Sequence, residues 1–251
     1  MAHRPIAVQM YTVRQAAAQD FRGVLRRVAE LGYTGVEVAG TFGLSAAELS
    51  QTLTDLGLKC VSAHVPLADL RTNLSREIDT YLVAGADFLI CPWLPPEQRG
   101  GEADYRTLAA ELNRIGEVCL SNGLQFCYHH HDFELVQFNG KYALEILLEE
   151  SDPANLQLEA DTYWLKFGGE DPATYLRRWP NRVPLLHLKD MTTTQPPTFA
   201  EVGTGILDWP SIFEAAEAVG TNWYIVEQDT CPGDPFESIR ISLEQLRRLL
   251  S

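Results

Sequence analysis

Residues 20–38 read DFRGVLRRVAELGYTGVEV and contain one full unit of the pattern that decides the fold. Asp20 precedes the amphipathic stretch Phe21–Leu31, where its side chain is suited to cap the first free backbone N–H groups of a helix. Gly32 then supplies the left-handed residue that commonly ends a helix. Thr34–Val38 follows directly and is rich in β-branched residues, which favours a strand. The stretch therefore predicts a helix, a glycine stop and a strand in succession.

The same alternation of helical and strand patterns continues along the whole chain. Eight strand-like apolar runs occur, at Ile6–Tyr11, Thr34–Val38, Leu58–Ala63, Asp87–Cys91, Leu124–Tyr128, Asn155–Leu158, Val183–Leu188 and Trp223–Val226. Eight helical patterns alternate with them, at Phe21–Leu31, Ala46–Leu56, Asn73–Ala84, Tyr105–Ser121, Ala143–Glu150, Pro172–Trp179, Trp209–Val219 and Pro235–Leu250. Dividing 251 residues by eight gives about 31 residues per unit, which fits right-handed βα crossovers. We predict an α/β fold, a closed (β/α)8 TIM barrel, with residues 1–251 as a single domain.

A doubly wound open sheet is the alternative α/β architecture. Such sheets usually have fewer strands and a glycine-rich phosphate-binding turn after the first one. Here Thr12–Gln15 follows the first predicted strand, so this turn carries no dinucleotide-binding fingerprint. The barrel is therefore favoured.

Composition and charge narrow the functional classes. The chain has 20 Lys and Arg residues against 34 Asp and Glu residues, a formal net charge of −14, which disfavours nucleic-acid and anionic-lipid partners. No charge-free apolar stretch reaches the ~20 residues of a membrane span, and the N-terminus lacks a signal-peptide pattern. Five cysteines without a C-x-x-C pair predict buried, reduced thiols. We expect a cytoplasmic protein that acts on a small molecule.

In a barrel of this kind, functional side chains lie at the C-terminal ends of the strands. The polar residues at or just after the predicted strands are Gln9, Glu37, His64, Glu134, Asp161, His187, Lys189 and Glu227. Four of these come from four successive strands: Glu134, Asp161, His187 and Glu227. One donor per strand can surround a central ion, and three carboxylates with one imidazole suit Mn²⁺, Mg²⁺ or Co²⁺ and tolerate Zn²⁺. A divalent ion would also relieve the repulsion between the carboxylates.

The order and spacing of several motifs resemble those of the xylose isomerase-like TIM-barrel superfamily of sugar isomerases and epimerases, near the members that act on keto sugars and keto-inositols. The resemblance covers nearly the whole chain. Its motifs are VQMYTVR at 8–14, GVE at 35–37, HHHDFE at 129–134, EADTYW at 159–164, HLKD at 187–190, VGTG at 202–205 and IVEQD at 225–229.

The resemblance implies that Glu134, Asp161, His187 and Glu227 bind one divalent ion, with Mn²⁺ expected and Mg²⁺, Co²⁺ or Zn²⁺ as alternatives. Glu134 and Glu227 would also be the catalytic pair, one removing a proton next to a carbonyl and the other returning it through an enediolate. Substrate contacts are implied for His64 and Lys189, and positions in the pocket wall for Glu37 and Trp164. The expected activity is isomerisation or epimerisation of an unphosphorylated sugar or keto sugar.

Several of these residues have simpler alternative roles. Glu37 has a buried salt bridge as its alternative, and Lys189 has a surface ion pair with Asp190. Strand alternation would turn His129 and His131 to one face and His130 to the other, which leaves a histidine-rich zinc site as a further possibility. We expect His129 or His131 to contact the substrate or to support the site, and His130 to pack between strand and helix.

The substrate and reaction class leave alternatives open. From Met191 to Asn222 the chain has no Lys or Arg, which disfavours a phosphate group at the usual barrel position. A dehydratase or lyase that expels a β-oxygen from a keto sugar, 3-keto-glycoside or keto-inositol would use the same enolate, and the product mass would distinguish it.

A barrel endonuclease would need a zinc cluster and a basic face, which this sequence lacks. A non-catalytic carbohydrate-binding barrel is disfavoured because all four candidate ligands are present. Similar barrels commonly form homo-oligomers, which the sequence does not decide.

Overall fold

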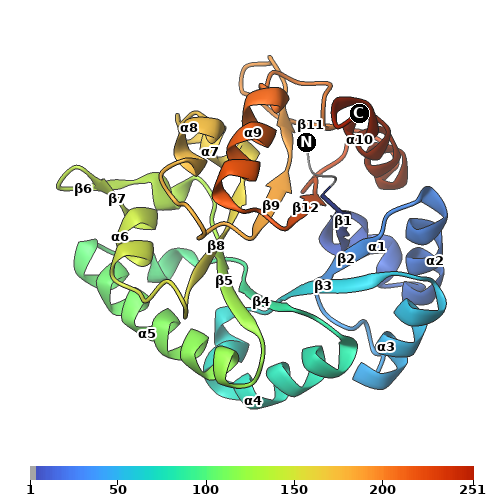
Figure 1. Ribbon diagram of the computed structural model, residues 1–251, viewed down its shortest axis with the longest axis horizontal. Coiled ribbons are helices and arrows are strands. Elements are labelled where there is room, and N and C mark those ends of the chain that lie inside the picture. The colour runs from blue at the N-terminus through green and yellow to red at the C-terminus, as the bar shows by residue number, and fades with distance from the viewer. Residues whose placement is uncertain (1–3) are drawn as a thin grey trace.

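The computed structural model describes residues 4–251 and shows a closed barrel of parallel strands surrounded by helices (Figure 1). The barrel strands are β1 (Ile6–Gln9), β2 (Gly35–Val38), β3 (Lys59–His64), β4 (Phe88–Cys91), β5 (Gln125–His129), β8 (Gln157–Asp161), β9 (Leu185–Leu188) and β12 (Trp223–Val226). Their order around the barrel follows the chain, and β12 closes it by pairing with β1. The predicted (β/α)8 TIM barrel is confirmed.

Helices on the outside connect the strands. They are α1 (Arg14–Ala17), α2 (Phe21–Leu31), α3 (Ala46–Asp55), α4 (Leu67–Ala84), α5 (Glu102–Ser121), α6 (Ala143–Glu149), α7 (Thr162–Phe167), α8 (Pro172–Leu176), α9 (Trp209–Val219) and α10 (Pro235–Leu249). Single 3-10 turns lie at η1 (Met10–Val13), η2 (Pro96–Gln98) and η3 (Phe133–Leu135). None of the described helices is both long and apolar enough to cross a bilayer.

The predicted helix boundaries of the first unit follow from local hydrogen bonding. Asp20 caps α2, because its carboxylate accepts a hydrogen bond of 2.9 Å from the N–H of Gly23. Gly32 ends the helix in the left-handed conformation with a φ of 95°, a backbone conformation that residues other than glycine rarely adopt. The following chain then enters β2 beside β1.

Most predicted boundaries differ from the structure by a few residues, and three differences have a clear physical reason or consequence. Strand β8 extends to Asp161 rather than ending at Leu158, because its C-terminal half carries polar residues that face the barrel interior. Helix α4 begins at Leu67 and bends at Asn73, whose φ of −134° is not helical. The sequence prediction took this bend for the helix start. The six-residue helix α7 was not predicted.

An apolar layer inside the barrel forms the floor of the C-terminal end. It consists of Ala7, Val61, Phe88, Ile90, Cys127, Leu185 and Ile225. The larger core lies between the strands and the helices. Cys60, Cys91, Cys119 and Cys127 are buried free thiols, as predicted, and Cys231 is half-buried.

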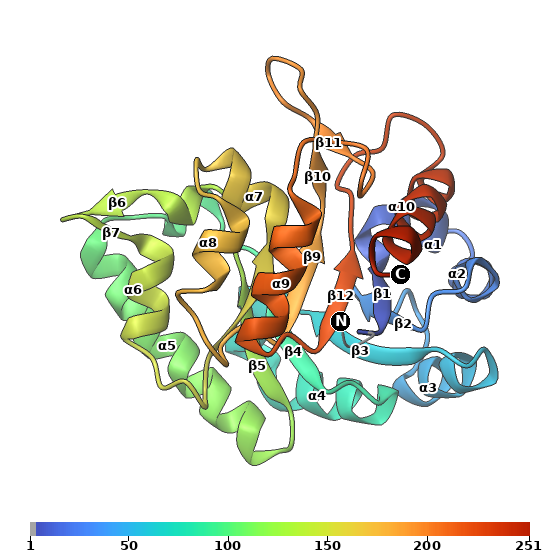
Figure 2. The ribbon, with the colours of Figure 1, turned by 45° about the horizontal axis from the view of Figure 1, so that its top comes forward.

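Two short hairpins extend the loops at the C-terminal end of the barrel (Figure 2). Strands β6 (Gln137–Phe138) and β7 (Lys141–Tyr142) form one, and β10 (Asp190–Met191) and β11 (Phe199–Ala200) form the other. In Figure 2 the β10–β11 hairpin projects beyond the strands, above the end toward which the barrel strands point.

Candidate functional site

The polar side chains of the candidate site lie directly above the apolar floor. Along a strand every second side chain points to the same face. His129, His187 and Glu227 each lie two positions after a floor residue of their own strand, and all three are buried. The parallel register also places Asp161 opposite His187 on neighbouring strands. Strand alternation therefore gathers ionisable groups at one level of the barrel.

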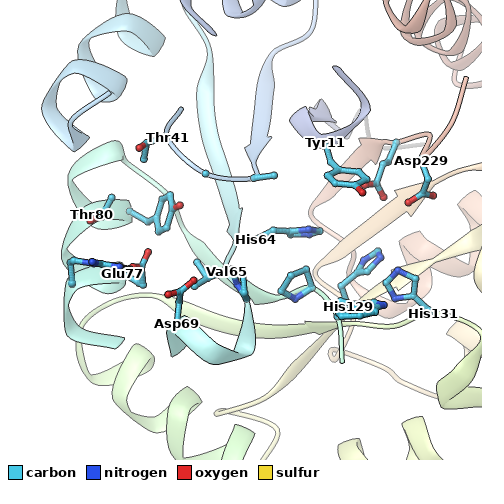
Figure 3. Close-up of a pocket in the computed structure, with 18 residues that line it drawn as sticks. Tyr11, Thr41, His64, Val65, Asp69, Glu77, Thr80, His129, His131 and Asp229 are labelled. Carbon is cyan, nitrogen blue, oxygen red and sulfur yellow. Dashed lines mark hydrogen bonds and ion pairs between the residues drawn. The ribbon is translucent and has the colours of Figure 1, made fainter. Parts of the chain in front are cut away.

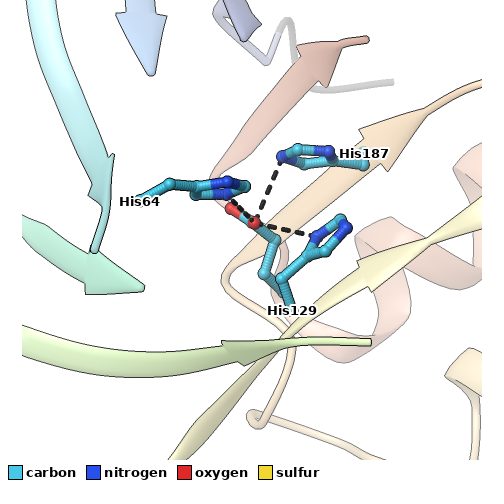
Figure 4. Close-up of side chains that lie close together, drawn as sticks. His64, His129 and His187 are labelled. Carbon is cyan, nitrogen blue, oxygen red and sulfur yellow. Dashed lines mark hydrogen bonds and ion pairs between the residues drawn. The ribbon is translucent and has the colours of Figure 1, made fainter. Parts of the chain in front are cut away.

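Two overlapping sets of four side chains bring nitrogen and oxygen donors within 4.8 Å of one another. Both contain His129 and His187. One set is completed by Asp161 and Glu227, the other by His64 and Glu159. Figure 4 shows the rings of His64, His129 and His187 turned toward one carboxylate, that of Glu159, at 2.8, 3.0 and 3.2 Å. Three of the four predicted ligands, Asp161, His187 and Glu227, thus lie together.

Of the described residues, Glu134 joins neither set, which corrects the prediction that it lies with the other three. Its carboxylate accepts hydrogen bonds from the Tyr128 hydroxyl at 2.5 Å and from the His131 backbone N–H at 2.8 Å. Tyr128 belongs to the core between strands and helices, so Glu134 is held outside the barrel interior. Burial raises the pKa of Glu134 to about 7. His129, two positions after Cys127, takes its place at the end of β5, and this alternation is the sequence signal that identifies it.

Glu37 lies in a buried ion-pair network, the alternative role predicted for it. Its carboxylate lies 2.7 Å from His187 Nε2 and 2.9 Å from His64 Nε2. Further hydrogen bonds come from Gln9 and Ser62. Although burial raises the pKa of Glu37, His64 and His187 hold it well below its ordinary value. Burial lowers the pKa of His64, but Glu37 and Glu159 raise it to about 10, so His64 is an imidazolium at neutral pH.

Glu159 was missed by the sequence prediction. It lies on β8 opposite His129, and its carboxylate contacts three imidazoles. Burial and the charge of Glu37 raise the pKa of Glu159. Its position two residues before Asp161, on the same face of β8, is the signal that identifies it.

Lys189 is buried and pairs with three carboxylates. Its Nζ lies 2.6 Å from Glu227, 2.9 Å from Asp229 and 3.1 Å from Asp161. Burial raises the pKa of Glu227, but Lys189 and His187 together hold it well below its ordinary value, so Glu227 stays ionised. The alternative of a surface ion pair with Asp190 is wrong, because the Asp190 carboxylate is engaged on the other side of the strand. It accepts hydrogen bonds from the backbone of Met191, Gly203, Gly205 and Leu207 and from the indole of Trp209.

The three consecutive histidines have different surroundings. His130 is buried, and its Nε2 accepts a hydrogen bond of 3.0 Å from the backbone N–H of Asp161. Burial lowers its pKa to about 4, so it is neutral. His131 lines a cavity and packs against Trp164, with ring centroids 5.1 Å apart. His130 therefore positions Asp161, while His131 faces the space that a ligand would occupy.

A cavity of about 970 Å³ opens above these groups (Figure 3). Among the described residues that line it are the predicted substrate contacts His64 and His131, together with Glu227. Lys189, Glu37 and Trp164 contact these lining residues and are not among those that line the cavity themselves. The exposed aromatic side chains Tyr11 and Trp93 lie on its rim.

Comparison with known proteins agrees with this architecture. The model of the xylose isomerase-like TIM barrel family matches residues 25–249. The chain belongs to this family. It is 26% identical to a protein named inosose dehydratase from Geobacillus thermodenitrificans, over 86% of this chain and 85% of that protein. A crystal structure of a sugar phosphate isomerase/epimerase from Parabacteroides distasonis superposes with a TM-score of 0.85 and 25% identity, covering 98% of this chain and 94% of the other.

Another solved structure shares the fold at lower identity. The IolI protein, whose crystal structure is described as having a bound zinc atom, superposes with a TM-score of 0.79 at 14% identity, covering 98% of each chain. At this identity the likeness shows the fold alone.

In the chain described here, the candidate donor set of His129, Asp161, His187 and Glu227 fits a divalent ion. Asp161 Oδ2 and His129 Nδ1 are buried and have charged neighbours, Lys189 Nζ at 3.1 Å and Glu159 at 3.0 Å, but neither contact has hydrogen-bond geometry within the described residues. Buried polar atoms usually have a well-aligned hydrogen-bond partner, so both atoms remain suited to bind an ion. Replacing the predicted Glu134 by His129 gives two imidazoles and two carboxylates, a set that suits Zn²⁺, Mn²⁺ or Co²⁺ better than Mg²⁺.

Proposed function

We propose that this protein is a divalent-metal-dependent lyase that eliminates a β-oxygen, as water or an alcohol, from an unphosphorylated keto sugar or keto polyol. The ion would be held by His129, Asp161, His187 and Glu227. When bound, it would polarise the ketone oxygen and stabilise the negative charge that develops there. The proposed location remains the cytoplasm.

The observation that carries this proposal is the position of Glu134 outside the site. Isomerisation and epimerisation of the predicted kind return a proton to carbon and rest on two glutamates, one on each side of the substrate. Here only Glu227 of that pair faces the cavity. An elimination needs two different groups instead, one that removes a proton from carbon and one that protonates the leaving oxygen.

The cavity offers groups in two protonation states. His64 is charged because Glu37 and Glu159 raise its pKa to about 10 against the effect of burial. Its Nε2 contacts both carboxylates, which leaves Nδ1 for a ligand. Burial and the nearby Lys189 lower the pKa of His131 well below its ordinary value, so this ring is neutral. We assign His64 as the acid, and His131 or Glu227 as the base, because groups whose environments separate their pKa values serve as acid and base.

The charges of the cavity favour a neutral, hydroxyl-rich substrate. Arg76 is the one Lys or Arg side chain among the described residues that line it, and it pairs with Glu77 at 2.7 Å. Asp69, Glu227 and Asp229 also line the cavity. Carboxylates accept hydrogen bonds from hydroxyl groups and repel a phosphate. The inosose dehydratase name of the Geobacillus relative supports elimination from a cyclic polyol ketone.

The test is a product analysis with the metal-loaded protein. Keto-inositols, 3-keto-glycosides and free ketoses are incubated separately with protein supplied with Zn²⁺, Mn²⁺ or Co²⁺, and products are analysed by mass spectrometry. We expect loss of water or of an alcohol, and Glu227→Gln should abolish it. An isomer of unchanged mass that carries one deuterium from D₂O would instead support the isomerase alternative and reject elimination.

A further inference from the structure

The residues that line the cavity fall into two groups, and we call the space beside each group the inner arm and the outer arm. The inner arm lies at the strand ends and is lined by His64, His129, His131, Glu227 and Asp229. The outer arm lies over helix α4 and the loop after β2, and is lined by Thr41, Asp69, Arg76, Glu77, Thr80 and Tyr81. In Figure 3, Thr41, Glu77 and Thr80 lie on one side of Val65, and the imidazoles and Asp229 lie on the other. The proposed chemistry uses only the inner arm.

The bend of helix α4 shapes the outer arm. Asn73 departs from helical geometry and divides α4 into two segments. Asp69 lies on the first segment, and Glu77 and Thr80 lie on the second, yet all three line the same cavity. Local hydrogen bonds stabilise the bend. The Asn73 amide donates one to the Thr72 hydroxyl at 3.1 Å and a weaker one to the Asp69 carboxylate at 3.5 Å.

The size of the cavity exceeds the needs of one sugar ring. Its volume of about 970 Å³ lies at the upper end of the roughly 300–1,000 Å³ that enclose drug-sized ligands. A single hexose or inositol ring is smaller than such ligands. If one ring occupied the inner arm, the outer arm would remain available for a group attached to it.

The chemistry of the outer arm matches a second sugar ring. Carboxylates at Asp69 and Glu77 accept hydrogen bonds from hydroxyl groups, and the hydroxyls of Thr41 and Thr80 donate and accept them. Trp93, which is 44% exposed on the rim, offers an apolar ring face of the kind that packs against the C–H groups of a sugar.

We propose that the outer arm is a binding site for a second sugar ring, joined to the first through the oxygen that leaves. This inference rests on the proposed lyase function and narrows its substrate to a 3-keto-glycoside. The leaving group would then be an alcohol, the released second ring, rather than water. A reaction that oxidises the C3 hydroxyl of the glycoside must supply this substrate.

The elimination balances without another reactant. The C2–H bond breaks, its proton passes to the base, and its electron pair forms a C1=C2 double bond conjugated with the C3 ketone. The C1–O bond breaks with its electrons staying on oxygen. A proton from the acid converts that oxygen into the hydroxyl group of the released ring.

The test compares the binding of one-ring and two-ring ligands that cannot react. Glucose and cellobiose lack the ketone, so calorimetric titration of the metal-loaded protein measures binding without turnover. We expect cellobiose to bind at least about tenfold more tightly than glucose, which corresponds to one or two net hydrogen bonds. Thr80→Trp should fill the outer arm and remove this preference, whereas Val83→Trp, on the exposed side of α4 and away from both the bend and the cavity, should keep it.

A second pair of variants guards against misfolding of the tryptophan variant. Asp69→Leu should also lose the preference for cellobiose, and Asp79→Leu, an exposed α4 position outside the cavity, should retain it. Equal affinities in the unmodified protein, no measurable cellobiose binding, or a preference that survives both cavity variants would overturn the second-ring site. The two proposals can also fail separately. If the cavity variants lose the preference for cellobiose and the control variants keep it, but the protein eliminates nothing from any keto substrate, the second-ring site is supported and the lyase function is rejected.

Discussion

Replacing Glu134 by glutamine tests whether this carboxyl group belongs to the fold or to the site. Glu134 is fully buried, and burial raises its pKa from 4.5 to about 7. Between these pH values the folded protein holds the proton that the unfolded chain has released. The stability that this group contributes is therefore fully present below about pH 4.5 and is lost as the pH rises through 7. The difference corresponds to about 3 kcal/mol.

Glutamine does not ionise, so Glu134→Gln should lose this pH dependence. The amide keeps one acceptor for the donors Tyr128 and His131 and leaves the other mismatched, which should cost about 1–3 kcal/mol at pH 4.5. By pH 8 the variant should recover most of this loss relative to the unmodified protein. Urea unfolding of both proteins at a series of pH values measures the two curves.

Activity and metal content complete this experiment. We expect Glu134→Gln to bind metal normally and to keep turnover within about tenfold, while the matched Glu227→Gln variant loses turnover. A loss of activity or metal in Glu134→Gln as deep as in Glu227→Gln would refute the placement of Glu134 outside the site. Parallel stability curves for Glu134→Gln and the unmodified protein would refute its burial as a raised-pKa carboxyl group.

Three further variants test other parts of the site. Lys189→Met leaves Asp161 and Glu227 without their buried cation, so metal-free protein should lose about 3–5 kcal/mol in urea unfolding, and added Zn²⁺ or Mn²⁺ should restore part of it. His129→Ala should weaken metal binding beyond the roughly 10–100-fold typical of residues behind the ligands, and an unchanged metal content would count against its assignment. Asp190→Asn places an amide among five N–H donors and should cost at least about 3 kcal/mol; a thermal melt equal to that of the unmodified protein would contradict this.

The barrel could be predicted because its signals are local. Asp20 and Gly32 delimit α2 through hydrogen bonds and backbone conformation that involve only nearby residues. Strand β8 was placed too early because hydropathy favours apolar strands, whereas Glu159 and Asp161 are polar and face inward. The bend at Asn73 depends on side-chain contacts within α4, and the sequence pattern alone does not distinguish it from a helix start.

The candidate site could be predicted where a residue lies inside a strand. Asp161 and His187 lie at strand positions whose direction alternation determines, and the structure brings them together. The prediction for Glu134 was wrong because this residue follows the end of β5 by five residues. Beyond the end of a strand, alternation no longer determines where a side chain points. The hydroxyl of Tyr128, on the outer face of the strand, then decides where the carboxylate points.

The buried charges of the site are largely compensated within the protein, so binding of the proposed metal ion would exchange one positive charge for another. Burial lowers the pKa of His187, but Glu159 and Glu37 raise it well above its ordinary value, so this ring must lose a proton to become a ligand. An ion bound by Asp161 and Glu227 would compete with Lys189 for the carboxylate oxygens that its ammonium contacts now. Asp229 already contacts the ammonium at 2.9 Å and lines the cavity. If an ion displaced the ammonium from the other two carboxylates, the contact with Asp229 would keep it next to the cavity.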